Sequence, residues 1–184
     1  MCQDQNRRLD AVLGSATTKL AELSDSARLD AEILLGQSID MPRSYLFAHP
    51  DDILDDAAFD RFVALLQRRL HGEPMAYIVG TREFWSHELL VSPATLIPRP
   101  ETELLVELAL REIPRKAAWN ILDLGTGSGA IAIALAGERL LCEICAVENS
   151  RGALAIAREN ARQLSLGNIT FFEGSWTQPV RDRK

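Results

Sequence analysis

DLGTGSGA, residues 123–130, follows a short apolar run and leads into a run of small and branched apolar residues. Glycines directly after a strand let the backbone turn sharply and approach a ligand closely. The helix that follows offers unpaired N–H groups and the positive end of a dipole. Because the string also matches the dinucleotide pattern G-x-G-x-x-A, it predicts a loop that binds a nucleotide-like cofactor.

Strand and helix patterns alternate around this loop. The predicted order is a strand at 120–124, a helix at 129–136, a strand at 143–147, a helix capped by Ser150 that carries Leu154, Ala157 and Ala161 on one face, and a strand at 169–172. A βαβαβ order implies right-handed crossovers and a parallel sheet. It is half of a doubly wound domain, so the predicted fold class is α/β with an incomplete Rossmann-like domain.

Two acidic residues flank the loop. Glu148 lies 23 positions after Gly125, at the end of the next strand, where an acid can hold ribose hydroxyls. Asp123 places a carboxylate where the pyrophosphate of a dinucleotide would lie, and like charges repel there. A cofactor with an ammonium and a sulfonium group suits Asp123 better than NAD does. The alternatives are that Asp123 only caps the loop amides and that Glu148 is a surface acid.

The first 74 residues show helical patterns without strand-like alternation. The first predicted helix covers 6–23, and the second is capped by Ser26 and carries Leu29, Ile33 and Leu34 on one face. A short third helix has Pro42 in its first turn and runs through Tyr45 and Leu46, and the last covers 56–71 with Phe59, Phe62, Val63 and Leu66 buried. This pattern predicts an N-terminal helical bundle as the first domain, residues 1–74.

The composition changes at Glu73-Pro74, where β-forming residues begin. From Met75 to Val91 they cluster around Gly80 and Ser86-His87, which is typical of a β-hairpin. We therefore predict a β-hairpin linker over 75–98. A helix that begins at Pro100 and carries Leu104, Leu105 and Leu108 then opens the third region, 99–184.

Charge and cysteine usage exclude several classes of function. The net charge of the chain is −6, and its first 74 residues carry 13 acidic and 8 basic side chains. This excess of negative charge disfavours binding to a nucleic-acid backbone. The sequence shows neither a signal peptide nor a membrane span, so we predict a cytoplasmic protein. Cys142 and Cys145 fall in a predicted buried strand and point to opposite faces, so we predict core cysteines and no metal site.

Five segments together resemble the HemK/PrmC family of protein-(glutamine-N5) methyltransferases, which modify peptide chain release factors. They are PMAYIVGTREFW (74–85), VSPATLIPRPETELLVE (91–107), ILDLGTGSGAIAIALA (121–136), AVENSRGALAIARENA (146–161) and FFEGSW (171–176). The glycine loop is common to class I methyltransferases, whereas REFW and LIPRPETE directly upstream of it are much more specific. The resemblance implies a class I (Rossmann-like) methyltransferase domain and a helical domain that helps to recognise the release factor.

The resemblance also implies the cofactor and its binding residues. The cofactor is S-adenosyl-L-methionine, and the implied binding residues are Asp123, Gly125, Thr126, Gly127, Ser128, Gly129, Glu148 and Trp176. The loop from Gly125 to Gly129 would cradle the methionine part, Glu148 would bind the ribose and Trp176 would lie beside the adenine. Family members usually have Asp where this chain has Glu148.

One family motif does not occur in the 184 residues. Asn-Pro-Pro-Tyr, expected shortly beyond Trp176, positions the substrate amide for methyl transfer, and no other residue here replaces it. We therefore assign no catalytic residue and expect a truncated, inactive form whose first strand presents an unpaired edge. The alternatives are a non-catalytic fragment that binds a release factor or the cofactor, and an NAD-binding half-domain.

Overall fold

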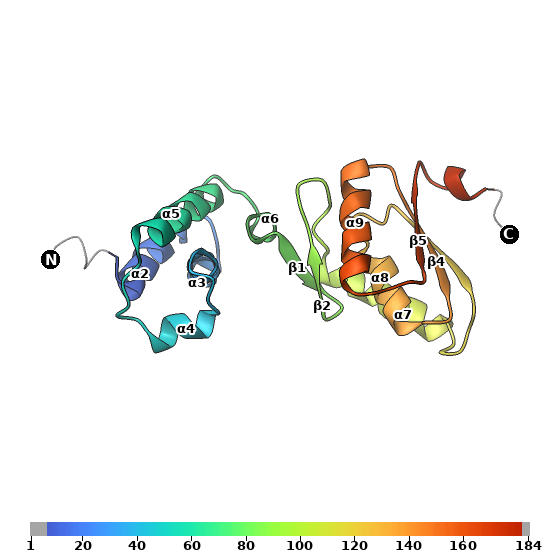
Figure 1. Cartoon of the computed structure of the whole chain (residues 1–184), viewed down its shortest axis with the longest axis horizontal. Coiled ribbons are helices and arrows are strands. Elements are labelled where there is room, and N and C mark those ends of the chain that lie inside the picture. The colour runs from blue at the N-terminus through green and yellow to red at the C-terminus, as the bar shows by residue number, and fades with distance from the viewer. Residues whose placement is uncertain (1–6, 182–184) are drawn as a thin grey trace. The chain divides into compact units, whose positions relative to one another are not determined.

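The computed structural model describes residues 7–181 (Figure 1). Contacts within the chain divide it between Val79 and Gly80 into two compact units. We call residues up to Val79 unit 1 and residues from Gly80 onward unit 2. Each unit has its own hydrophobic core, so each is described separately.

Unit 1 is a helical bundle, which confirms the predicted fold of this region. Its helices are α2 (Leu9–Leu20), α3 (Ala27–Ser38), α4 (Arg43–Ala48), α5 (Asp56–Leu70) and α6 (Met75–Val79). Aliphatic and aromatic side chains from the longer helices form the core, among them Leu20, Leu34, Leu35, Phe62 and Leu66. Asp55 caps α5 by accepting from the Ala58 N–H, and Gly72 follows the helix at φ 85°.

The buried face of α3 differs from the one predicted. Leu29 is 39% exposed, whereas Asp30 and Glu32 are buried. Arg69 of α5 pairs with Asp30 at 2.9 Å, and the exposed Arg28 and Arg43 both pair with Glu32. Buried carboxylates are tolerated when they are paired, and a spacing pattern in one helix cannot reveal partners on another.

Three further expectations for the helices were wrong in detail. The first helix is shorter than 6–23, since α2 ends at Leu20 and residue 6 lies outside the described residues. Ser26 stands at the N-cap of α3 but makes no capping hydrogen bond there; its hydroxyl donates to Asp30 instead. Val63 of α5 is 37% exposed, because the apolar face of that helix is narrower than its sequence suggests.

The predicted hairpin is present, but it is shorter than its β-forming residues suggested. Residues 75–79 form α6, because the Pro74 carbonyl accepts from the Tyr77 and Ile78 N–H groups and starts a helical turn. The strands are β1 (Thr81–Phe84) and β2 (His87–Leu90), paired antiparallel.

The hairpin turn contains two residues, Trp85 and Ser86, at φ 52° and 59°. Positive φ at both positions matches the type I′ turn that suits the twist of a hairpin. Glu103 accepts from the Trp85 main-chain N–H at 2.8 Å, and Glu138 accepts from its indole N–H at 3.1 Å. These two bonds hold a bulky residue in a conformation that it rarely adopts.

The helix predicted from Pro100 begins as the 3-10 turn η1 (Pro100–Thr102) and continues as α7 (Glu103–Glu112). Its apolar side chains mostly face outward: Leu104, Leu105 and Leu108 are 57%, 54% and 47% exposed. Val106 is the residue of α7 that enters the core.

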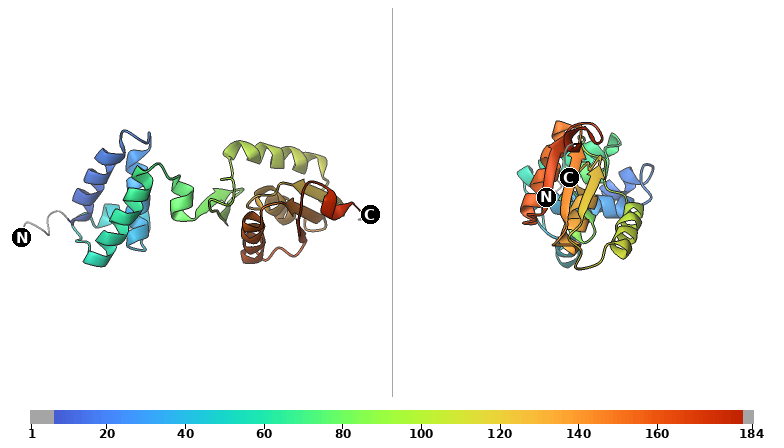
Figure 2. Two further views of the ribbon diagram at one scale, coloured as in Figure 1. Left: turned by 90° about the horizontal axis from the view of Figure 1, so that it is seen from above. Right: turned by 90° about the vertical axis from the view of Figure 1, so that its right-hand side faces the viewer.

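The rest of unit 2 follows the predicted βαβαβ order. The elements are β3 (Asn120–Leu124), α8 (Ala130–Glu138), β4 (Glu143–Glu148), α9 (Arg151–Gln163) and β5 (Ile169–Glu173), followed by the turn η2 (Gln178–Val180). The three strands are parallel, with β4 between β3 and β5 (Figure 2). Ser150 caps α9 as predicted, accepting from the Ala153 N–H. A partial Rossmann-like sheet is thus confirmed.

The sheet has one covered face and one open face. Ile144 and Ala146 of β4 are buried in the core with the apolar residues of α8. On the other face Leu122 and Leu124 are 44% and 36% exposed. Within residues 7–181 no strand pairs with the outer edge of β3, so the expected unpaired edge is present.

The two cysteines differ from the expectation of a shared strand. Cys142 precedes β4 and is fully buried, and its thiol donates to the Ala117 carbonyl at 3.3 Å. Cys145 lies within β4 opposite Thr170 and is half-buried. Of these two cysteines, Cys142 is therefore the core residue, because Cys145 lies on the strand face that is less covered.

Candidate functional site

The carboxyl ends of the three parallel strands meet at one edge of the sheet, where open α/β sheets bind their ligands. A cavity of about 260 Å³ lies at this edge. It is lined by Leu124, Gly125, Val147, Glu148, Asn149, Gly174, Ser175 and Trp176. The structure therefore brings the predicted residues Gly125, Glu148 and Trp176 to one opening.

The glycine loop is fixed to the neighbouring strand by its backbone. The N–H groups of Gly125 and Thr126 both donate to the Val147 carbonyl, at 2.8 and 3.1 Å. Gly125 and Gly127 have φ of 79° and 57°, and a Cβ atom built on either would meet no atom within 4 Å. Both glycines therefore suit a left-handed backbone that leaves open space beside it for a ligand.

Gly129 has a different role from the other two loop glycines. A Cβ atom built on it would lie 3.0 Å from Ile133 Cδ1 and 3.2 Å from the Cβ of Ala157 on α9. Its missing side chain allows α9 to pack closely against the start of α8. Ser128 beside it is 2% exposed, so contact of the cofactor with Ser128 or Gly129 stays a prediction.

Asp123 is held beneath the loop by Thr126. The Thr126 hydroxyl donates to Asp123 Oδ2 at 2.7 Å, and Thr126 itself is buried. Burial raises the pKa of the Asp123 carboxyl above its ordinary value, and the charge of Glu148 acts in the same direction. Hydrogen bonds from Thr126 and from the main chain of Ala132 oppose this rise.

Glu148 joins the ends of two strands through its carboxylate. Oε2 accepts from the Gly127 N–H at 2.9 Å, and Oε1 accepts from the N–H groups of Asn149 and Ser150 at 2.8 and 2.9 Å. The sequence did not predict this contact with the glycine loop.

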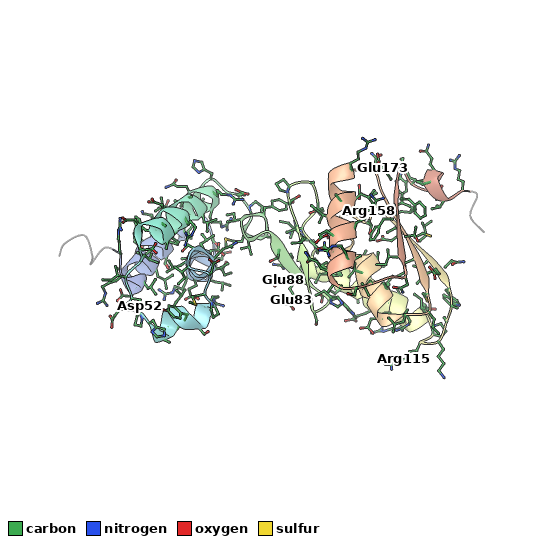
Figure 3. The ribbon with its side chains drawn as sticks, in the orientation of Figure 1. Asp52, Glu83, Glu88, Arg115, Arg158 and Glu173 are labelled. Carbon is green, nitrogen blue, oxygen red and sulfur yellow. The ribbon has the colours of Figure 1, made fainter. Side chains whose placement is uncertain are left out.

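The neighbouring acid on β5 is already neutralised. Figure 3 labels Glu173 at the carboxyl end of β5, where it lies opposite Glu148 in the sheet register. Arg151 at the start of α9 donates to Glu173 at 2.7 Å, and this contact raises the pKa of the Arg151 guanidinium. Glu148 is therefore the acidic side chain that lines the cavity, whereas Asp123 lies beside the loop, bonded to Thr126, and does not line it.

Sequence comparison finds matches for both units. The model of the PrmC N-terminal domain matches residues 11–80, and a methyltransferase domain model matches residues 115–183. Release factor glutamine methyltransferases are similar to the chain: that of Vibrio cholerae is 50% identical over 178 residues, and that of Escherichia coli is 49% identical over 155. In both units the chain is similar to proteins of the HemK/PrmC family.

The match to these family members is partial in length. The alignments cover 95% of this chain and 61% of the Vibrio cholerae protein, and 84% of this chain and 56% of the Escherichia coli protein. The chain thus spans about 60% of the length of the curated relatives that it matches. A solved structure, the METTL16 methyltransferase domain, aligns at TM-score 0.45 and 19% identity, covering 53% of this chain and 46% of that one.

The cofactor of the HemK/PrmC family is S-adenosylmethionine, and the polar groups at this site suit its charges. Of the two predicted carboxylates, Glu148 lines the cavity and suits a ligand that carries an ammonium and a sulfonium, whereas Asp123 is bonded to Thr126 and does not line it. Trp176 is 75% exposed at the rim of the cavity, at φ 50°, where its ring can cover a flat base.

Some residues at the site were not predicted. Asn149 follows Glu148, and Gly174 and Ser175 precede Trp176; all three line the cavity. The Gly174 N–H donates to the Glu148 carbonyl at 3.0 Å, which fixes the end of β5 beside that of β4.

Within residues 7–181, no group of three or more potential ligand side chains is placed to hold a metal ion. None of the described helices has the length and apolar character needed to cross a bilayer.

Proposed function

We propose that unit 2 binds S-adenosylmethionine at the carboxyl edge of its sheet, as part of an enzyme that methylates the side-chain amide nitrogen of a glutamine in peptide chain release factors. The names of similar relatives, release factor glutamine methyltransferases, support the reaction and its substrate. The glycine loop supports the cofactor, with Gly125 to Gly129 around the methionine part and Glu148 and Trp176 toward the adenosine.

The contact between Glu148 and the glycine loop supports S-adenosylmethionine rather than NAD as the cofactor. A dinucleotide pyrophosphate binds to free N–H groups of such a loop, but the Gly127 N–H already donates to a carboxylate. Asp123 adds a second carboxylate below the same loop. Two negative charges repel a pyrophosphate and attract the cationic methionine part of S-adenosylmethionine, so NAD is the less suitable ligand.

The 184 residues supply cofactor binding without the substrate-positioning motif. They contain no Asn-Pro-Pro-Tyr, and we assign no other residue to that role. Methyl transfer to an amide depends on holding a weak nucleophile in line with the methyl group. We therefore propose that these residues by themselves bind the cofactor and do not turn over. A fragment that only binds a release factor or the cofactor is the second candidate.

Unit 1 is the candidate for recognition of the release factor. Its match to the PrmC N-terminal domain supports this role, and its excess of acidic side chains disfavours a nucleic-acid partner. A cytoplasmic location fits a substrate that acts in translation and remains part of this proposal.

A chimera tests the reaction. The segment of the Vibrio cholerae relative that lies beyond the aligned region would be fused after residue 181, and methyl transfer to purified release factor and to DNA would be measured. We expect the chimera to methylate a glutamine of the release factor and not to methylate DNA. We expect the unfused chain to methylate neither substrate. The matched control replaces the Asn of the added Asn-Pro-Pro-Tyr with Ala. Methylation of DNA without methylation of release factor would contradict the proposal.

A further inference from the structure

A buried asparagine on α9 connects the β-hairpin to the glycine loop. Asn160 is 1% exposed. Its Oδ1 accepts from the Leu90 N–H at 2.7 Å, and its Nδ2 donates to the Leu90 carbonyl at 3.0 Å and to the Ser128 carbonyl at 2.9 Å. One amide group therefore holds two segments that are 38 residues apart in the sequence.

The geometry of these bonds resembles strand pairing. Leu90 is the last residue of β2, and the Asn160 amide satisfies both its N–H and its carbonyl, as a neighbouring peptide group would. The second hydrogen of the same NH₂ group goes to Ser128, so both donor hydrogens of the side chain are used. Gln is the other residue type whose side-chain amide offers one acceptor and two donor hydrogens, and its side chain is one methylene longer.

The same face of α9 contacts the loop a second time. Ala157, one turn before Asn160, lies so close to Gly129 that a Cβ atom on that glycine would be 3.2 Å away. Ala157 fixes how near α9 comes to the loop, and Asn160 fixes the Ser128 carbonyl at the point where the loop becomes α8. Positioning a ligand-binding loop requires both a distance and an orientation, and α9 supplies them together.

We propose that Asn160 is a positioning residue that sets the conformation of the cofactor loop and keeps it in register with β2 of the hairpin. This inference rests on the proposed function, since it takes the ligand of the loop to be S-adenosylmethionine. Without the amide, the Ser128 carbonyl loses its buried donor, and the loop gains freedom next to Gly127, which has open space beside it for a ligand.

The test uses Asn160→Leu in the full 184-residue chain, with Asn168→Leu as the matched control. Leu is close to Asn in size and has no polar atoms. Asn168 also donates to three main-chain carbonyls, those of Ala136, Arg139 and Cys142, but it precedes β5 at the opposite edge of the sheet. Each variant loses three hydrogen bonds between the side-chain amide and the main chain, so both should be less stable to thermal unfolding.

The affinity for S-adenosylmethionine separates a positioning role from a structural one. By calorimetric titration at a temperature where both variants are folded, we expect Asn160→Leu to weaken binding about tenfold or more, and Asn168→Leu to change it less than about twofold. Equal losses of affinity in the two variants would show that Asn160 acts only through overall stability and would overturn the proposal.

Hydrogen exchange distinguishes failure of this inference from failure of the proposed function. If the unsubstituted chain binds no S-adenosylmethionine, the proposed function is wrong, and the exchange rates still decide the role of Asn160. We expect Asn160→Leu to speed exchange at Leu90 and at residues 127–130 by about tenfold relative to Ile144 in the centre of the sheet. Uniform acceleration, or none at these residues, would overturn the inference.

Discussion

The main-chain N–H of Gly127 donates to the carboxylate of Glu148 at 2.9 Å, across the gap between the ends of β3 and β4. The same carboxylate holds the N–H groups of Asn149 and Ser150. An acid that would bind the ribose of a cofactor therefore also closes onto the loop that would bind its methionine part. A ligand hydroxyl that binds Glu148 in place of the Gly127 N–H replaces one hydrogen bond of the carboxylate with another. The contact between Gly127 and Glu148 therefore sets the affinity of the site for that ligand.

Substitution of Glu148 tests this contact. Asp is one methylene shorter, so its carboxylate would release Gly127 and keep its charge for the ribose; we expect an affinity for S-adenosylmethionine within about threefold of the unsubstituted chain. Gln keeps the length and loses the charge, and should weaken binding about tenfold. Titration calorimetry measures both. The control is Glu143→Gln at the amino end of the same strand. Undiminished binding by Glu148→Gln would exclude Glu148 from the site.

The loop glycines should separate affinity from stability. Gly127→Ala adds a Cβ in open space at φ 57°, so it should cost about 1 kcal/mol of stability and most of the cofactor affinity. Gly80→Ala, at φ 86° with no atom near its Cβ, is the matched control for backbone strain and should leave affinity unchanged. Gly129→Ala forces its Cβ against Ala157 and should cost about 2 to 3 kcal/mol. Urea unfolding and titration of each variant measure the two effects, and a Gly127→Ala chain that binds normally would place the cofactor elsewhere.

Asp123 should make cofactor binding depend on pH. Burial raises its pKa above the ordinary 3.8, so in the unliganded chain its contribution to stability is present at low pH and is lost as the pH rises through the raised pKa. A cationic ligand favours the ionised carboxylate. We therefore expect affinity for S-adenosylmethionine to increase as the pH rises through that pKa, with proton release on binding.

Calorimetry in buffers of different ionisation enthalpy detects that proton. Asp123→Asn is the matching variant, because it keeps the shape and can still meet the Thr126 hydroxyl. Its affinity should be lower and independent of pH across the same range. A steep pH dependence that persists in Asp123→Asn would assign the titration to another group.

Arg139 should be important for stability rather than for binding. Arg139 is 7% exposed, and its guanidinium donates to the carbonyls of Leu110, Ile113 and Glu138 at 2.6, 2.8 and 2.9 Å, which caps the C-terminal ends of α7 and α8. Arg139→Met leaves these carbonyls without a donor and should cost about 2 to 4 kcal/mol in urea unfolding. Arg111→Met, at an exposed site near the end of α7, should cost less than about 0.5 kcal/mol. Equal costs would contradict the capping role.

The sequence predicted the features of unit 2 that depend on local pattern. The short apolar runs at β3, β4 and β5, the glycine spacing after β3 and the capping Ser150 all depend on a few neighbouring residues, and the structure has each of them. The meeting of Gly125 and Glu148 also followed from the pattern, because parallel strands place their carboxyl ends at one edge.

Features that depend on distant partners could not be predicted in this way. Asp30 is buried because Arg69, 39 residues later, pairs with it. Asn160 was not singled out from the sequence, and only the folded chain places it against Leu90 and Ser128. Trp85, whose φ is positive, donates hydrogen bonds to Glu103 of α7 and Glu138 of α8. In each case a tertiary contact overrides a local preference.

Titration calorimetry of the 184-residue chain with S-adenosylmethionine and with NAD, repeated on Gly127→Val, tests the assignment of the cofactor site most directly. We predict saturable binding of one S-adenosylmethionine per chain, no binding of NAD, and loss of S-adenosylmethionine binding in Gly127→Val, whose side chain would occupy the open space beside the loop. Saturable binding of NAD, or binding of S-adenosylmethionine that is unchanged in Gly127→Val, would contradict the assignment.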